Sequence, residues 1–209
     1  MKLKFFRYFL FVFIMLLTCG VTELSAAETA GSILDKAATK IRSAKSISAS
    51  YTITADGHKQ SGEIIVAGNC FAISSPQISS WYDGKTQWTY STQTGEVNIT
   101  DPTTEELQQV NPFAIINSFR KLYKAVALKA PATEKKIRLT ASNPKNDIKS
   151  VVLTLDATTL YPSRIELALS NRRTVSIDVT SVKSGEQLPQ SEFRFNPKLY
   201  PGVPIVDLR

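Results

Sequence analysis

Residues 70–99, which read CFAISSPQISSWYDGKTQWTYSTQTGEVNI, predict the middle of a large antiparallel sheet. Large side chains alternate there with small or polar ones; they are Phe71, Ile73, Trp88, Tyr90, Val97 and Ile99. A period of two places alternate side chains on one face of a pleated strand. The dipeptides Asp-Gly at 83–84 and Thr-Gly at 94–95 lie between the runs and tolerate the positive φ that hairpins need. We therefore expect one apolar face that carries all of these large side chains, and one polar face.

Period-two patterns continue on both sides of this stretch. Upstream, Ile47, Ala49, Tyr51 and Ile53 alternate with serines and threonines, and a second strand is expected over 60–67 after an Asp-Gly turn. Downstream, strands are expected at 136–141, 149–156, 162–169, 173–183 and, briefly, 193–195. The C-terminal NPKLYPGVPIVDLR contains three prolines and is expected to wrap the sheet edge without regular structure.

Three helices are expected beside these strands. In residues 28–44, Ile33, Ala37 and Ile41 recur at helical spacing while the basic residues lie off that stripe. Thr103 and Glu106 have the form of a capping box that opens a short helix over 103–110. The Asn-Pro pair at 111–112 predicts the start of another helix over 112–127. The apolar face of that helix would comprise Phe113, Ile115, Ile116, Phe119, Leu122, Tyr123 and Val126.

The first 27 residues predict a secretory signal peptide. Lys2, Lys4 and Arg7 precede an apolar run over 8–17, and Ser-Ala-Ala at 25–27 matches the small-residue pattern before a cleavage site. A membrane span needs about 20 apolar residues, so export with cleavage is favoured over anchoring. The mature chain would then be a single domain over 28–209. The alternative is that Cys19, in LLTCG, is lipid-modified and anchors the protein.

Composition and motifs argue against several classes of function. The net charge of +7 is spread along the chain with acidic residues between the basic ones, whereas nucleic-acid binding favours a clustered basic stripe. The single histidine, His58, falls in a predicted turn, and no Cys/His cluster has metal-ligand spacing. Neither a nucleophile elbow nor a glycine-rich phosphate loop is present. We therefore expect no catalytic residue, metal or cofactor, and no enzyme.

The apolar face of such a sheet must be covered, because soluble monomers rarely expose large apolar patches. The three helices are the candidates, and they would enclose either a packed core or a hollow. The candidate cavity residues on the sheet are Tyr51, Ile53, Ile64, Val66, Phe71, Ile73, Trp88, Tyr90, Leu153, Leu155, Ile165, Leu167, Ile177, Phe193 and Phe195. The candidate lid residues are Phe113, Ile116 and Phe119. Periodicity alone does not separate a lined cavity from a filled one, so each could equally be a core residue.

The order of these elements resembles the LolA-type periplasmic outer-membrane lipoprotein carriers over nearly the whole mature chain. The most specific pieces are residues 41–51, Phe71, the DGK at 83–85 with Trp88 and Tyr90, the NPF at 111–113, and Phe193-x-Phe195-x-Pro197. The resemblance implies an α+β fold: a strongly curved antiparallel sheet, an incomplete β-barrel of about ten to eleven strands, under a lid of about three helices.

The same resemblance implies a function. Such carriers are monomers that receive acylated lipoproteins from an inner-membrane ABC-type release complex and pass them to an outer-membrane acceptor. One departure concerns the lid. Family members carry an arginine that latches the helices, whereas the matching region here is Ala-Gly-Asn-Cys at 67–70. Two alternatives remain: a lipid- or lipoprotein-sensing regulatory module, and an outer-membrane-anchored acceptor if Cys19 is acylated.

Overall fold

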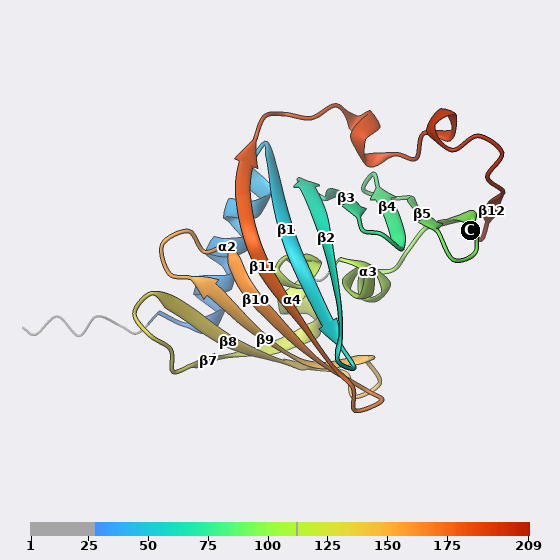
Figure 1. The fold of residues 1–209 in the computed structure, drawn as a ribbon. Coiled ribbons are helices and arrows are strands. Elements are labelled where there is room, and N and C mark those ends of the chain that lie inside the picture. Colours follow the sequence, from blue (N-terminus) through green and yellow to red (C-terminus); the bar gives the residue numbers. More distant parts are fainter. Residues whose placement is uncertain (1–27, 112) are drawn as a thin grey trace, which may run out of the picture.

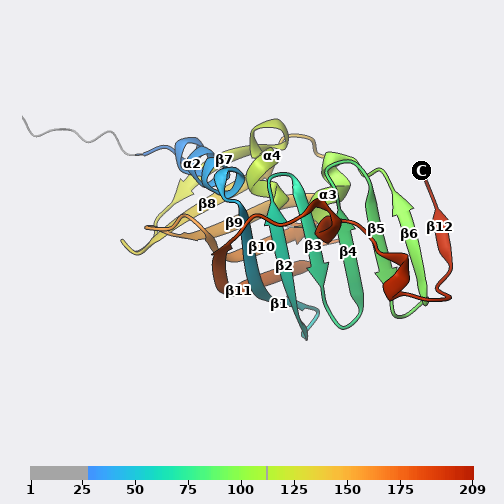
Figure 2. The same cartoon turned by 90° about the horizontal axis from the view of Figure 1, so that it is seen from above.

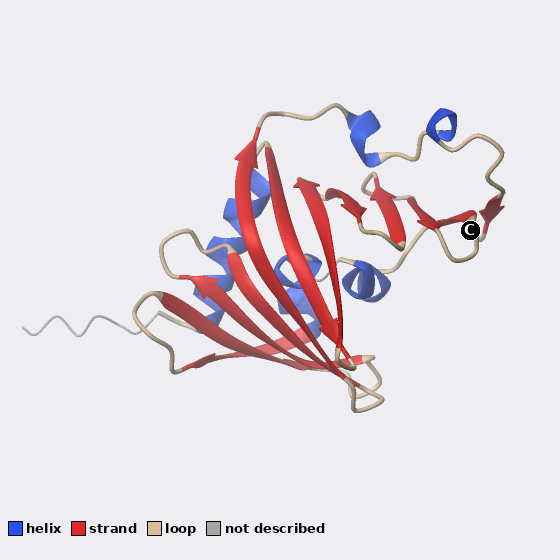
Figure 3. Cartoon of the chain, viewed as in Figure 1, coloured by secondary structure: helices blue, strands red, loops and turns tan. Residues whose placement is uncertain are grey.

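A 12-stranded open sheet forms the scaffold of the computed structural model, which describes residues 28–111 and 113–209 (Figure 1). The strands are β1 (Ser46–Ala55), β2 (His58–Ala67), β3 (Cys70–Ser74), β4 (Ile78–Tyr82), β5 (Gln87–Ser91), β6 (Glu96–Thr100), β7 (Tyr123–Leu128), β8 (Glu134–Ala141), β9 (Ile148–Asp156), β10 (Pro162–Leu169), β11 (Thr174–Gly185) and β12 (Ile205–Asp207). The helices are α2 (Ala30–Ser43), α3 (Thr104–Val110) and α4 (Ala114–Leu122), with 3-10 helices η1 (Gln190–Phe193) and η2 (Pro197–Leu199). Figure 3 separates the two classes of element by colour.

The strand order is β12-β6-β5-β4-β3-β2-β1-β11-β10-β9-β8-β7. All neighbouring strands pair antiparallel except β12, which runs parallel to β6. The long-range pair β1–β11 joins an N-terminal wing of hairpins to a C-terminal one. A register shift at Ser50/Tyr51 interrupts that pair, and such bulges bend a sheet. The sheet is strongly curved and does not close, so the predicted fold class is confirmed.

The hairpin turns lie where glycine predicted them. Gly57, Gly84 and Gly95 have φ values of 78°, 100° and 69°, a region that side chains with a Cβ rarely adopt. Gly57 lies between β1 and β2, Gly84 between β4 and β5, and Gly95 between β5 and β6. These positions explain why short local signals were sufficient to place the reversals.

The three helices lie on the concave face of the sheet (Figure 2). α2 begins after Thr29, whose side chain accepts a hydrogen bond from the Ser32 amide at 3.2 Å, and it buries Ile33, Leu34 and Ile41. The capping box predicted at α3 is present, with Thr103 and Glu106 each bonding the other's backbone. The expected helix start at Pro112 lies outside the described residues, and α4 itself begins at Ala114.

The predicted helix over 112–127 is wrong in its last five residues, 123–127. α4 ends at Leu122, and Tyr123–Leu128 form strand β7, paired with β8 at one edge of the sheet. Tyr123 is buried, whereas Val126, which we expected on the apolar helix face, is 59% exposed. Residues 123–128 are compatible with both periods, and pairing with β8 selects the period of two.

The C-terminal segment also differs from its prediction. Residues 193–195 do not form a strand: Phe193 ends η1, and the chain continues to β12, where regular structure was not expected. Residues 205–207 contain no proline and therefore keep the amides that pairing requires, and the Val97 amide bonds the Pro204 carbonyl at 2.9 Å. We call residues 189–207 the C-terminal arm. Figure 2 shows it in red, running from β11 past β3 and β4 to β12.

The sheet carries large side chains on both faces around β4 and β5, which corrects the expectation of a single apolar face. Phe71 pairs with Tyr82, and Tyr82 with Gln87, so Gln87 shares the concave face with Phe71. Trp88 and Tyr90 therefore point to the convex face. Each strand's alternation distinguishes two faces, but the turn lengths decide which residues of neighbouring strands share one.

The C-terminal arm covers this convex face. Tyr200 packs against Trp81, Tyr90 and Phe195, with ring centroids 5.7, 4.9 and 5.2 Å apart. Phe193 is 2% exposed but does not belong to the main core, and η1, which ends at Phe193, contacts β3 and β4. Phe195 and Phe193 are thus parts of a second small core and do not face the helices.

Candidate functional site

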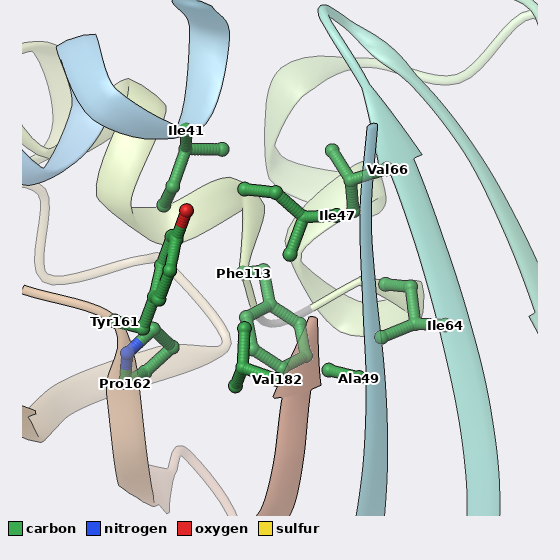
Figure 4. A pocket seen from close by; sticks show the side chains of 9 residues that line it. All are labelled: Ile41, Ile47, Ala49, Ile64, Val66, Phe113, Tyr161, Pro162 and Val182. Carbon is green, nitrogen blue, oxygen red and sulfur yellow. The ribbon is translucent and has the colours of Figure 1, made fainter. Parts of the chain in front are cut away.

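Two voids lie between the helices and the concave face. The first is an apolar pocket of about 20 Å³ (Figure 4). Its lining residues are Ile41, Ile47, Ala49, Ile64, Val66, Phe113, Tyr161, Pro162 and Val182. Figure 4 shows Phe113 among side chains from α2, β1, β2 and β11. The pocket has room for about one water-sized sphere, and its apolar walls offer little to hold one.

The second void is a groove of about 200 Å³ beside the pocket. It is lined by Ile41, Val66, Gly68, Asn69, Cys70, Phe71, Tyr82, Gly84, Thr104, Leu107, Asn111, Phe113, Ala114, Asn117 and Ser118. One wall is the β2–β3 turn with the end of β4, and the other is α3 and α4. Ile41, Val66 and Phe113 line both voids, so these three side chains separate the pocket from the groove.

The rest of the concave face is filled by side chains. Four of the predicted cavity residues line a void: Ile64, Val66, Phe71 and Phe113. The others that face the helices belong to or pack against the main core: Tyr51, Ile53, Ile73, Ile116, Phe119, Leu153, Leu155, Ile165, Leu167 and Ile177. Trp88, Tyr90, Phe193 and Phe195 lie on the convex side. In this conformation the helices therefore cover a mostly packed interior.

Several lining residues were not among the predicted site residues. Ile41, Ile47 and Ala49 carried the expected apolar periodicity of α2 and β1, but that pattern could not mark them as void-lining. Tyr161, Pro162 and Val182 come from the distant β10–β11 region and reach the pocket only through the β1–β11 pairing. No local signal in the sequence indicates their proximity to Phe113.

A buried hydrogen-bond network holds α3, α4 and β7 together. Gln108 is 2% exposed; its Nε2 donates to Ser118 Oγ at 2.6 Å, and its Oε1 accepts from the Tyr123 hydroxyl at 2.7 Å. The Ser118 hydroxyl donates in turn to the Ala114 carbonyl at 2.9 Å. Burial raises the pKa of Tyr123 to about 12, with a smaller contribution from Glu105. Such a network fixes the relative positions of α3, α4 and β7, because a movement that left one of its buried polar groups unpaired would cost free energy.

An exposed ion pair joins α4 to α2. The Arg120 guanidinium donates to both carboxylate oxygens of Asp35, with Nε 2.8 Å from Oδ1. This hydrogen bond holds the pKa of Asp35 below its usual value. Arg42 adds a long contact to Asn117 at 3.4 Å. Solvent screens such a pair, so it contributes little to stability but defines how α4 docks on α2.

The Ala-Gly-Asn-Cys turn at 67–70 lies at the groove, at the place where family members are expected to carry a latching arginine. Gly68 has φ 59°, and Asn69 and Cys70 line the groove without an ionic contact to the helices. In the described residues the polar contacts that hold α4 are the Gln108 network, the Arg120–Asp35 pair and the Arg42–Asn117 contact, and the apolar face of α4 packs in the main core.

Other kinds of site are not seen in the described part of the chain. Residues 28–111 and 113–209 contain no group of three or more His, Cys, Asp or Glu placed to bind a metal. Within the same ranges, no helix combines the length and the apolar character needed to cross a membrane. The predicted signal peptide and Cys19 lie outside the described residues.

A family model described as outer membrane lipoprotein carrier protein LolA matches residues 21–171. Among solved structures, an uncharacterised conserved protein from Thermus thermophilus has a TM-score of 0.59 at 11% identity, covering 85% of this chain and 98% of its own. A LolA superfamily protein from Nitrosomonas europaea has a TM-score of 0.41 at 15% identity, over 80% and 98%. MucB of Pseudomonas aeruginosa, in complex with MucA, has a TM-score of 0.46 at 12% identity, over 81% and 62%. No curated protein sequence matches.

Proposed function

Because the chain belongs to the outer membrane lipoprotein carrier protein LolA family, we propose that it binds the acyl chains of lipoproteins and carries them through the periplasm from the inner to the outer membrane. The observation that carries the proposal is the pair of adjoining voids beneath α2, α3 and α4. The pocket is lined by apolar side chains, and the groove has polar side chains along part of its lining. A lipoprotein needs such a combination, because its acyl chains are apolar and its polypeptide is polar.

The energetics favour a dedicated carrier. At about 0.8 kcal/mol per buried CH₂, one 16-carbon chain represents roughly 12 kcal/mol of apolar surface that water disfavours. Ligand pockets commonly measure about 300–1,000 Å³. The pocket of about 20 Å³ is far smaller, so the proposal requires that the helices move before cargo enters.

Lid side chains would compete with cargo for the concave face. Ile116 is fully buried, and Phe119 and Phe113 are 5% and 9% exposed, all packed against the surface that an acyl chain would occupy. Reclosure would bury these side chains again and so offset the loss of cargo contacts. Such exchange makes both uptake and release feasible, because neither state leaves the apolar face exposed to water.

The proposed pathway includes partners and a location. We propose export with cleavage near Ala27, receipt of lipoproteins from an inner-membrane ABC-type release complex, and delivery to an outer-membrane acceptor by a monomer. Binding, not catalysis, is the proposed activity. Depletion of the protein followed by membrane fractionation tests transport: lipoproteins should accumulate in the inner membrane, and normal sorting would contradict the proposal.

Two further measurements separate the alternatives. A changed envelope-stress response with normal lipoprotein sorting would instead support a regulatory sensing module. Mass spectrometry of the mature N-terminus tests the acceptor alternative, since a terminus at Glu28 excludes acylation of Cys19. Direct transfer is measured by incubating purified protein with membranes that contain an acylated lipoprotein and following the soluble complex, with a non-acylated form of the same lipoprotein as control.

A further inference from the structure

Phe113 lies at the boundary between the two voids, inside the apolar core and outside the polar contacts that hold the helices. Its ring lines both the pocket and the groove. Its backbone amide donates to Asn111 Oδ1 at 3.0 Å. The Gln108 network and the Arg120–Asp35 pair involve other residues. Moving the Phe113 ring would therefore break neither of these polar contacts and would disturb only apolar packing, since the side chain belongs to the core and is 9% exposed.

The groove differs from the pocket in chemistry. Its described lining offers amides from Asn69 and Asn117 and the hydroxyl of Thr104, whereas the Ser118 hydroxyl is already bonded to Gln108 and to the Ala114 carbonyl. None of the described lining residues is Asp, Glu, Lys, Arg or His. An amide or a hydroxyl pairs well with an ester carbonyl or an alcohol, whereas a buried phosphate or carboxylate would need a positive partner.

From these observations we propose that Phe113 is a gate, and that the groove binds the uncharged polar end of an acylated molecule, a glyceryl ester, while the acyl chain passes Phe113 into the pocket. This inference rests on the proposed function, and it adds the entry route and the charge of the group that is recognised. Swinging the ring joins the two voids into one amphipathic channel. Full accommodation of the chain then requires further movement of α4.

Cys70 provides a reporter at the border between the groove and the C-terminal arm, because it lines the groove, is partly exposed and has its Sγ 3.6 Å from Gln190 Nε2. The experiment measures alkylation of Cys70 by N-ethylmaleimide in protein purified from the cell envelope, read by peptide mass spectrometry so that Cys19, if retained, is counted separately. The ligands are 1-monopalmitoylglycerol and, as the charged comparison, palmitate at pH 8. At about ten times its Kd, monopalmitoylglycerol should slow Cys70 alkylation about tenfold, because only about one site in eleven stays free.

A matched pair of variants tests the gate. Phe113→Leu keeps an apolar side chain but opens the boundary, so the association rate of monopalmitoylglycerol should rise about tenfold. Phe193→Leu is the control, since Phe193 is a comparably buried phenylalanine that lines neither void and lies in η1, away from α4. Leucine was chosen over alanine because it leaves a smaller cavity and both variants should fold.

Each outcome bears on a different claim. If monopalmitoylglycerol binds and Cys70 is still alkylated at the rate measured without ligand, the groove does not bind the polar end of the ligand. If palmitate binds and protects equally well, the preference for an uncharged group is wrong. If both leucine variants change the association rate equally, Phe113 is not a gate. If the protein binds neither ligand and extracts no lipoprotein, the proposed function fails together with this inference.

Discussion

At the scale of single residues, the hydroxyl of Tyr123 tests how strongly the buried network fixes the lid. Tyr123→Phe removes the donor to Gln108 Oε1 and leaves a buried amide oxygen unpaired, so the free energy of unfolding should fall by about 1–3 kcal/mol in urea denaturation. Tyr161→Phe is the control, because its hydroxyl contact to Ser184 at 3.3 Å is exposed. If both variants lost the same free energy of unfolding, burial of the Tyr123 hydroxyl would not explain its contribution to stability.

The same residue predicts an alkaline limit to stability. The pKa of Tyr123 is raised from 10.0 to about 12, so the folded state favours the neutral phenol. Its contribution is complete below pH 10 and is lost as the pH rises from 10 toward 12. The wild type should therefore lose stability over this interval, and Tyr123→Phe should lose less. Denaturation curves at about pH 9, 10 and 11 measure the difference, and parallel losses would contradict it.

At the scale of elements, the Arg120–Asp35 pair connects two helices whose separation would admit cargo. Arg120→Met should leave global stability nearly unchanged, since the pair is exposed, but hydrogen exchange of α4 amides should become faster. Lys121→Met, its exposed neighbour, is the control. The pKa of Asp35 is lowered by Arg120, so the pair stabilises docking above the ordinary carboxyl pKa and is lost as the pH falls below it. Unchanged exchange in Arg120→Met would show that the pair does not hold α4.

A substitution that disrupts the packing of the C-terminal arm should destabilise the protein and expose side chains on the convex face. Phe193→Ala empties a buried site under η1 and should lower the free energy of unfolding by about 3–5 kcal/mol. Tryptophan emission should also shift to the red as Trp81 is uncovered. Leu199→Ala, at a side chain that is 73% exposed, is the control. Wild-type stability in Phe193→Ala would show that the arm is not part of the folded core.

At the scale of the whole molecule, cargo binding depends on the apolar contact between α4 and the sheet. Phe119→Asp places a charge where the side chain is 5% exposed, so co-purifying acylated cargo should be lost. Lys121→Asp introduces the same side chain on the exposed side of α4, away from both voids, and should retain cargo. Circular dichroism separates a folded variant from an unfolded one. Unchanged cargo in folded Phe119→Asp would mean that α4 does not face the binding site.

The local features of this protein could be predicted from its amino-acid sequence. Alternation predicted most strands, Thr103 and Glu106 predicted the start of α3, and glycines placed the turns, because each depends on neighbours within a few residues. Long-range packing, in contrast, places residues 123–128 in the sheet, turns Trp88 and Tyr90 toward the C-terminal arm, and sets Phe113 between two small voids. Those outcomes depend on strand register and on packing between distant segments, and a periodic pattern shows that a strand has two faces without showing what covers each.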